Sequence, residues 1–242
     1  DPPSPQGERR WLYVAPLGPF THTEESVLAE ACEYLERYFC IPVKRIDRVP
    51  LPISGGGEHE LPRSAVRLGG RGFGPQVRSE WVLQKLLRPL VPDDAALLIG
   101  FTARDLWPGR SWNFVFGQAD LRRRVGVWSM ARLGGGKSDE EGRRTLLRRT
   151  LKVATHEAGH MLGMRHCVAF ACNMNGSNHL AESDRQPMHM CPVCTAKLAW
   201  AVDLDLAERG RQLASWAEGR GLSQVARAAW LSAADCGGQA GD

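Results

Sequence analysis

The sequence predicts an α/β (α+β) fold that combines a mixed sheet with helices. Apolar strand-like segments alternate with amphipathic helical segments along much of the chain, and this alternation is typical of a sheet covered by helices. The C-terminal part contains mainly helical patterns instead. The chain has 242 residues, of which 43% are hydrophobic, so it is long enough to bury one sizeable core. We therefore expect a single domain over residues 1–242.

Most of the expected strands lie in the first half of the chain. Residues 11–15 and 43–48 are predicted to be strands, and residues 95–102 form a nearly continuous apolar run that predicts a buried central strand. Two further short strands are expected near residues 113–118 and 125–131. These five segments would form one sheet.

The helices are predicted from amphipathic periodicity. Residues 24–39 form the first helix, and Thr21 or Thr23 can cap its acidic first turn. The later helices are expected at residues 75–88, about 140–162, about 195–217 and about 222–233.

Two stretches are expected to be loops. Residues 49–74 are rich in proline and glycine, and we expect them to form an exposed loop without a core of its own. Glycine runs at 55–57 and 134–136 both fall in expected loops. They are either native flexible turns or engineered replacements for longer loops.

A histidine motif on the long predicted helix indicates a catalytic zinc site. In His156-Glu-Ala-Gly-His160 the two histidines lie four residues apart. Such residues share one face of a helix, about 5–6 Å apart at Cβ, so both imidazoles can reach one metal ion. Glu157 leaves the helix on a neighbouring face, where its carboxylate can act as the general base on a zinc-bound water.

Gly163 and His166 complete the predicted set of ligands. A glycine at position 163 can adopt positive φ and end the helix, so the chain turns and brings His166 to the metal from another direction. Three neutral imidazoles leave one tetrahedral position for water, which is typical of a catalytic zinc site. The alternative is an accidental arrangement of packed or solvated histidines, and Gly163 with His166 argues strongly against it.

Four cysteines directly after the motif indicate a second metal site. They are Cys167, Cys172, Cys191 and Cys194. Four thiolates suit a closed tetrahedral zinc site that stabilises the structure. Two disulfides are the alternative, although nothing in the sequence indicates an oxidising compartment. A third interpretation, a redox-active Cys-x-x-Cys pair, has less support still, because no thioredoxin-like βαβ unit is predicted around these residues. The remaining cysteines, which we expect to be free thiols, are Cys32, Cys40 and Cys236.

The segment from His156 to Cys194 resembles the archaemetzincins, a branch of the metzincin zinc peptidases. The resemblance rests on a cysteine directly after the third histidine, on Cys172-Asn-Met174, and on the later Cys-x-x-Cys pair. Weaker similarity lies upstream, in Ile99-Gly-Phe-Thr102 to Asp105-Leu-Trp and in Phe114-Val-Phe-Gly117. We expect it to extend from about residue 10 to about residue 220. The spacing between Met174 and Cys191 is slightly shorter than in the family pattern.

The resemblance implies a metzincin-like mixed twisted sheet with an active-site helix, and a smaller helical C-terminal lobe stapled by a second zinc site. The two lobes of the catalytic domain would cover about residues 10–166 and about residues 167–235. The implied roles are catalytic zinc ligands for His156, His160 and His166, catalytic base for Glu157, structural zinc ligands for Cys167, Cys172, Cys191 and Cys194, and Met-turn residue for Met174.

We therefore expect a zinc-dependent metallopeptidase that hydrolyses peptide bonds in peptides or proteins and carries two Zn2+ ions. The strand near residues 114–118 is expected to form the upper rim of the cleft and to pair with an extended substrate. The alternative is a catalytically silent zinc-containing binding or scaffold protein, against which the intact Glu157 argues. Endopeptidase and aminopeptidase action use the same metal chemistry, so the motif does not distinguish them.

Charge and hydropathy argue against other partners. The net charge of +4 is modest, and the arginine clusters at residues 122–124, 143–144 and 148–149 are expected to be solvated surfaces. A nucleic-acid-binding zinc knuckle is disfavoured, because Phe170 is the one aromatic residue between the first and last cysteine. No apolar run reaches the roughly 18 residues that span a bilayer, and no signal peptide is visible. We expect a monomer inside the cell, cytoplasmic or nuclear, without nucleic-acid or membrane partners.

Overall fold

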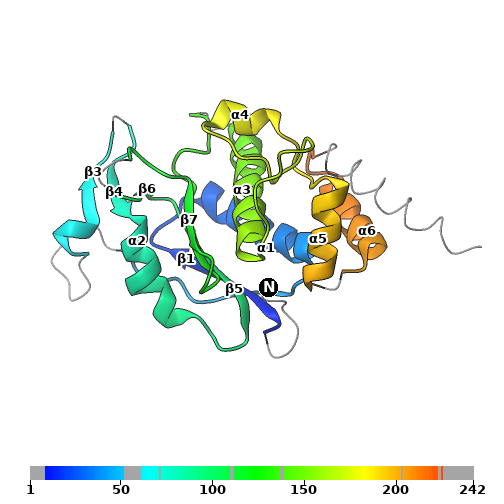
Figure 1. The fold of residues 1–242 in the computed structure, drawn as a ribbon. Coiled ribbons are helices and arrows are strands. Elements are labelled where there is room, and N and C mark those ends of the chain that lie inside the picture. Colours follow the sequence, from blue (N-terminus) through cyan, green and yellow to red (C-terminus); the bar gives the residue numbers. More distant parts are fainter. Residues whose placement is uncertain are drawn as a thin grey trace, which may run out of the picture.

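The computed structural model describes residues 9–51, 61–70, 72–109, 112–136, 139–202, 204–222 and 225 (Figure 1). Its main sheet has five strands in the order β2-β1-β5-β8-β7. The first four of these run parallel, and β7 lies antiparallel to β8 at the edge. The strands are β1 (Trp11–Leu17), β2 (Val43–Arg45), β5 (Ala95–Thr102), β7 (Gly117–Asp120) and β8 (Val125–Ser129). This mixed sheet, accompanied by helices, confirms the predicted fold class.

The long helix α3 lies near the centre of the molecule (Figure 1). The strands of the main sheet lie on one side of it, and α5 and α6 lie on the other. The helices are α1 (His22–Phe39), α3 (Glu140–Met161), α4 (Leu180–Arg185), α5 (Pro192–Val202) and α6 (Leu206–Ala217). Shorter helical turns are η1 (Arg63–Ala65), α2 (Ser79–Trp81), η2 (Val82–Leu87) and η3 (Arg88–Leu90).

The central strand β5 is buried along its whole length, as its apolar sequence predicts. Successive side chains of a strand point to opposite faces, so β1 and β5 contribute to two cores. Val14 and Ile99 pack in the core that includes α1 and α3. Ala15 and Leu98 pack on the other face, against the helical turns of residues 79–90. The helix that carries the histidine motif is therefore anchored on one face of a sheet that is covered on both sides.

Capping residues define where α1 and α3 begin. The Thr21 hydroxyl accepts a hydrogen bond from the Glu24 N–H, and the Thr21 N–H donates to the Glu24 carboxylate, which makes a capping box. Of the two threonines considered as caps, Thr21 is the one that the structure uses. Asp139 caps α3 by accepting from the Gly142 N–H at 2.9 Å.

The expected helix over residues 75–88 is partly wrong. Its first four residues form β4 (Pro75–Arg78), and helical turns begin only at α2. β4 pairs with β3 (Val66–Leu68) and β6 (Asp105–Trp107) in a second, three-stranded sheet that the sequence analysis did not predict. β3 is close to β4 in sequence, but β6 is distant from it, so a local pattern could not show the parallel pairing of β4 with β6.

The stretch from 49 to 74 is also more ordered than expected. It contains η1 and β3, and Ala65 is buried. Residues 52–60, with the glycine run at 55–57, lie outside the described residues. The expectation of a coreless loop is therefore wrong for the described part of this stretch.

The helix expected over residues 195–217 is two helices, α5 and α6. The break falls at Asp205, whose carboxylate accepts from the Glu208 N–H at 2.9 Å and caps α6. Aspartate favours such N-cap positions over helix interiors, which explains the interruption. The short helix α4 was not predicted. Most of the expected helix at 222–233 and Cys236 lie outside the described residues.

No helix in the described part of the chain combines the length and apolar character that a membrane crossing requires.

A glycine in β8 provides a test of how the sheet supports α3. A Cβ atom at Gly126 would lie 2.0 Å from the indole of Trp128, which is buried and donates from Nε1 to the Val153 carbonyl of α3. Gly126→Ala should therefore lower the free energy of unfolding by about 1–3 kcal/mol, the usual cost of overpacking. Urea unfolding measures this change. In the control Gly134→Ala, a Cβ meets no atom within 4 Å, and equal destabilisation of both variants would contradict the interpretation.

Candidate metal centre

The C-terminal end of α3 brings the three predicted histidine ligands together. The ring centroids of His156 and His160 lie 4.7 Å apart, those of His160 and His166 4.9 Å, and those of His156 and His166 5.3 Å. One nitrogen from each ring lies within 4.8 Å of the others. The predicted residues thus form a cluster of the size that a single metal ion requires.

The reversal of the chain after α3 places the third histidine. Gly163 has φ of 87°, a left-handed conformation that a residue with a side chain adopts only under strain. The N–H groups of Gly163 and Met164 donate to the carbonyls of His160 and Gly159, so the end of the helix is closed by the turn itself. From this turn His166 returns to face the helix.

Main-chain carbonyls orient two of the imidazoles. Nδ1 of His156 lies 2.7 Å from the Asn173 carbonyl oxygen, and Nδ1 of His160 lies 2.7 Å from the Met164 carbonyl oxygen. A carbonyl oxygen only accepts, so each Nδ1 carries the hydrogen and each Nε2 keeps its lone pair. The two Nε2 atoms lie 3.1 Å apart, directed to the same region.

The surroundings of His156 and His166 favour the neutral imidazole, which is the form that binds a metal ion. Burial lowers the pKa of His156 to about 4 and also lowers the pKa of His166. The adjacent imidazoles act in the same direction, because a second positive charge nearby would be unfavourable.

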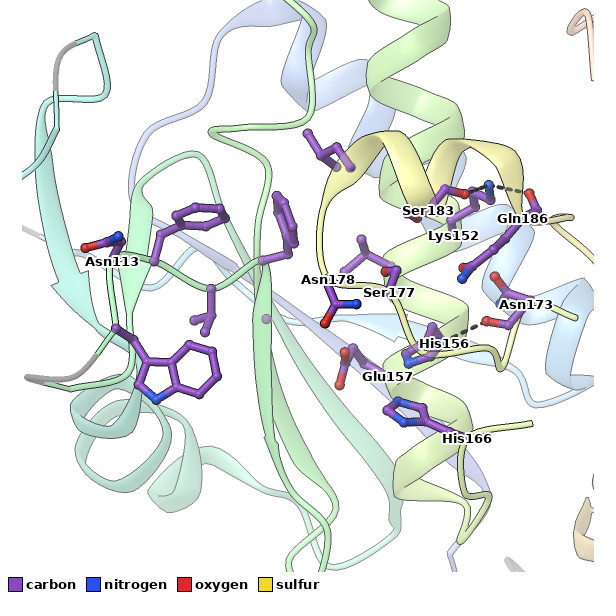
Figure 2. A pocket seen from close by; sticks show the side chains of 17 residues that line it. Asn113, Lys152, His156, Glu157, His166, Asn173, Ser177, Asn178, Ser183 and Gln186 are labelled. Atoms are coloured by element: carbon purple, nitrogen blue, oxygen red, sulfur yellow. Dashed lines mark hydrogen bonds between the residues drawn. The ribbon is translucent and has the colours of Figure 1, made fainter. Parts of the chain in front are cut away.

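Glu157 projects into the cleft beside His156 and His166 (Figure 2). Burial raises the pKa of its carboxyl group, and the His160 imidazole partly opposes this effect. No hydrogen bond from another described residue occupies the carboxylate. It is therefore available to accept a proton from a water molecule in the cleft.

Met174 packs against α3 at Gly159, the residue before His160. It is fully buried, and a Cβ atom at Gly159 would lie 2.6 Å from its sulfur. Gly159 is thus needed for the close approach of the thioether to the helix backbone. Met174 was expected here from the family resemblance, whereas Gly159 was not singled out, although a glycine in the middle of a helix is itself a signal of close packing.

The four predicted cysteine ligands form a second cluster. Their sulfurs all lie within 4.8 Å of one another, and Cys172, Cys191 and Cys194 are buried. The sulfurs of Cys167 and Cys191 are 3.8 Å apart, against about 2.05 Å in a disulfide. The cysteines in the described residues form no disulfide. The disulfide alternative is therefore wrong for this structure.

The main chain around these sulfurs suits bound thiolates. Cys172 Sγ accepts from the N–H groups of Met174 and Cys191, and Cys191 Sγ accepts from the Cys194 N–H. Contacts with the main chain of Ala169 and Phe170 lower the pKa of Cys167 to about 7. Burial raises the pKa of Cys172 and Cys194, so a divalent cation is needed to keep all four groups ionised. The donor set fits a structural zinc ion.

Residues 172–175 connect the two clusters. The Asn173 carbonyl orients His156, and the Asn173 amide donates to Thr155 Oγ1 of α3 at 2.7 Å. The Asn175 amide group accepts from the Cys172 N–H and donates to the Cys167 carbonyl. Sequence analysis assigned no role to these two asparagines. Their positions next to predicted ligands were the available signal.

A cleft of about 510 Å³ opens in front of the histidines (Figure 2). Residues 112–117 form one wall, and residues between Asn173 and Gln186 form the other. The floor is the part of α3 that includes Lys152, His156 and Glu157. The cleft thus gives a ligand direct access to the histidine cluster.

Comparisons with known proteins agree with this geometry. The profile described as Peptidase family M54 matches residues 93–200. Archaemetzincin-2 of Macaca fascicularis is 35% identical, over 88% of this chain and 65% of that protein. Human archaemetzincin-2 is 34% identical with the same coverage. The chain thus spans 65% of the length of these two curated relatives.

Solved archaemetzincin structures share the fold over nearly their whole length. The archaemetzincin of Methanopyrus kandleri has a TM-score of 0.60 and 28% identity, and the match covers 82% of this chain and 98% of that one. The archaemetzincin of Archaeoglobus fulgidus, solved in complex with malonate, has a TM-score of 0.53 and 30% identity, with coverage of 77% and 99%. The chain belongs to the archaemetzincins, peptidase family M54.

Proposed function

We propose that this chain is a zinc-dependent metallopeptidase that hydrolyses peptide bonds. The observation that carries the proposal is the convergence of three imidazoles at one end of a cleft, with a carboxylate beside them that no described residue hydrogen-bonds. A zinc ion held by His156, His160 and His166 would lower the pKa of water from 15.7 to about 7 and polarise the scissile carbonyl group. Membership of a peptidase family supports the same reaction.

In this proposal Glu157 moves the proton. Its carboxylate accepts a proton from the attacking water and then passes it to the nitrogen of the leaving amine. The raised pKa of Glu157 favours proton acceptance, since a stronger base takes the proton more readily. Met174 and the Asn173 carbonyl would keep the imidazoles in place while the charge on the substrate changes.

The substrate would lie as an extended peptide along β7. This strand is last in the order of the main sheet, and its far edge pairs with no other described strand. The Ser129 N–H donates to the Phe116 carbonyl, and Gly117 lies opposite Trp128. In an antiparallel pair bonded in this register, the N–H and C=O groups of Gly117 and Ala119 point away from β8. An extended peptide can pair with such an edge through its main chain.

The remaining expectations form part of the same proposal. The cleft would lie between a sheet lobe of about residues 10–166 and the lobe that follows it. We also propose two zinc ions, a peptide or protein substrate, a monomeric state and an intracellular location, cytoplasmic or nuclear.

Two observations support parts of this proposal. The cysteines in the described residues form no disulfides, which supports a reducing compartment. Arg143 pairs with Glu30 and Glu140, which supports a structural role for this arginine cluster and not nucleic-acid binding.

Replacement of the proposed base tests the reaction. Glu157→Gln should reduce the hydrolysis of a broad peptide library by about 10²–10⁴-fold, because it removes the group that transfers the proton. Zinc content and circular dichroism should stay as in the wild type. The matched control is Glu140→Gln, at the exposed start of the same helix. Full activity of Glu157→Gln contradicts the role of this residue, and zinc-loaded wild type that cleaves no peptide points to a binding or scaffold protein.

Zinc analysis of cysteine variants tests the second site. The wild type should contain two zinc ions per chain, and Cys191→Ser should lose one of them. The free energy of unfolding should fall by at least about 3 kcal/mol, since structural zinc contributes about 10–16 kcal/mol in small zinc domains. The control Cys40→Ser changes an exposed thiol outside both clusters and should keep both ions. A protein whose single zinc ion is lost in Cys191→Ser would contradict the two-site proposal.

Hydrogen exchange tests the position of the substrate. In Glu157→Gln, which should bind a peptide without cleaving it, the amides of Gly117 and Ala119 should exchange at least about tenfold more slowly when peptide is present. The amide of Gln118 faces β8 and serves as the internal control. Equal protection of Gly117 and Ala119 with and without peptide, measured by NMR, would exclude pairing at this edge.

A further inference from the structure

Lys152 is a buried cation in the floor of the cleft. It lies four residues before His156 on α3, so the two side chains share one face of the helix. Only 4% of Lys152 is exposed, and its side chain lies beside Ser183 and Gln186 (Figure 2). The ammonium group donates to the main-chain carbonyls of both residues, at 2.5 Å to that of Gln186.

The charge of Lys152 is not balanced within the described protein. Asp184 is the acidic group that raises the pKa of Lys152, and its carboxylate already accepts two hydrogen bonds from Arg149, at 3.0 and 2.6 Å. Arg148 lies 3.8 Å from the same carboxylate. No described carboxylate comes within ion-pair distance of Lys152. A buried charge without an opposite charge is costly, so this position is suited to a ligand that brings one.

The ammonium group also retains bonding capacity. It has three N–H donors, and the carbonyls of Ser183 and Gln186 accept two of them. Burial lowers the pKa of Lys152 to about 8, while the Asp184 carboxylate raises it, so the charged form predominates at neutral pH. Among the described residues that line the cleft, Glu157 is the one carboxylate, and the proposed reaction uses it.

We propose that Lys152 determines specificity by binding a carboxylate of the substrate next to the scissile bond. The inference rests on the proposed peptidase function and adds a substrate class to it. The carboxylate is the side chain of an aspartate or glutamate, or the C-terminal carboxylate of the peptide. Either carboxylate can accept a hydrogen bond from the remaining N–H of the Lys152 ammonium group and supply the negative charge that balances it.

Cleavage-site mapping on an unbiased peptide library is the first arm of the test. Wild-type protein should favour Asp or Glu at one of the two positions that flank the cleaved bond. Peptides that differ there as Glu against Gln should then differ at least about tenfold in kcat/KM, the ratio that corresponds to about 1.4 kcal/mol from one charge-assisted hydrogen bond. Peptides that end at this position, as the free acid or the amide, separate a terminal carboxylate from an acidic side chain.

Lys152→Met is the variant that isolates the ammonium group. It keeps a long apolar side chain and should reduce the Glu/Gln ratio to about one. The matched control is Arg148→Met, which removes a positive charge from the same helix outside the cleft lining and should leave the ratio as in the wild type. If Lys152→Met does not fold, the Glu/Gln and acid/amide ratios of kcat/KM measured for the wild type still test the proposal. Equal or better cleavage of the Gln and amide peptides would overturn the proposal.

Binding measurements separate this inference from the peptidase proposal. Zinc-loaded Glu157→Gln should bind the Glu peptide at least about tenfold more tightly than the Gln peptide in isothermal titration calorimetry. Such a preference without any cleavage by the wild type would support the role of Lys152 and contradict the peptidase function. Cleavage without a preference for either carboxylate, in kcat/KM or in affinity, would contradict the proposed role of Lys152 and leave the peptidase proposal intact.

Discussion

The packing of residues 172–174 against the end of α3 is the constraint on which both metal clusters depend. Cys172 contributes a sulfur to one cluster, the Asn173 carbonyl orients an imidazole of the other, and the Met174 thioether lies against Gly159. The Cys167 N–H donates to the Met174 carbonyl, which ties the residue after His166 to the same segment. A metal bound to the cysteines would therefore hold the floor of the histidine site in place.

The sheet supports this arrangement from the other side of α3. Trp128 of β8 packs in the core with α3 and donates to the Val153 carbonyl, which lies one turn before His156. Residues 112–117, which form one wall of the cleft, are held separately. Arg67 and Gln76 donate hydrogen bonds to the Asn113 carbonyl, and the buried Asp105 accepts hydrogen bonds from Gln76 and Arg132. The floor of the cleft and the wall of residues 112–117 are thus fixed by groups outside the cleft.

The two ends of the cleft floor carry different charges. Glu157 and the imidazoles lie at one point, and the unbalanced ammonium of Lys152 lies one helical turn away. The carboxylate of Asp184 is bound by Arg149 and does not form an ion pair with Lys152. A substrate that spans the cleft would meet a base at the reacting carbonyl and a cation beside it, and these two requirements act on different parts of the peptide.

Local sequence indicated the proposed histidine ligands, because histidines four residues apart on a helix and a glycine that ends it are short-range features. It also determined β5, whose apolar run of eight residues is buried throughout. The choice of Thr21 over Thr23 as the first cap came from the structure. Tertiary structure decided the second sheet, since β4 pairs in parallel with β6, which is distant in sequence. It also decided the roles of Asn173 and Lys152. Their hydrogen-bond partners and unbalanced charge exist only when residues 172–186 fold back onto α3.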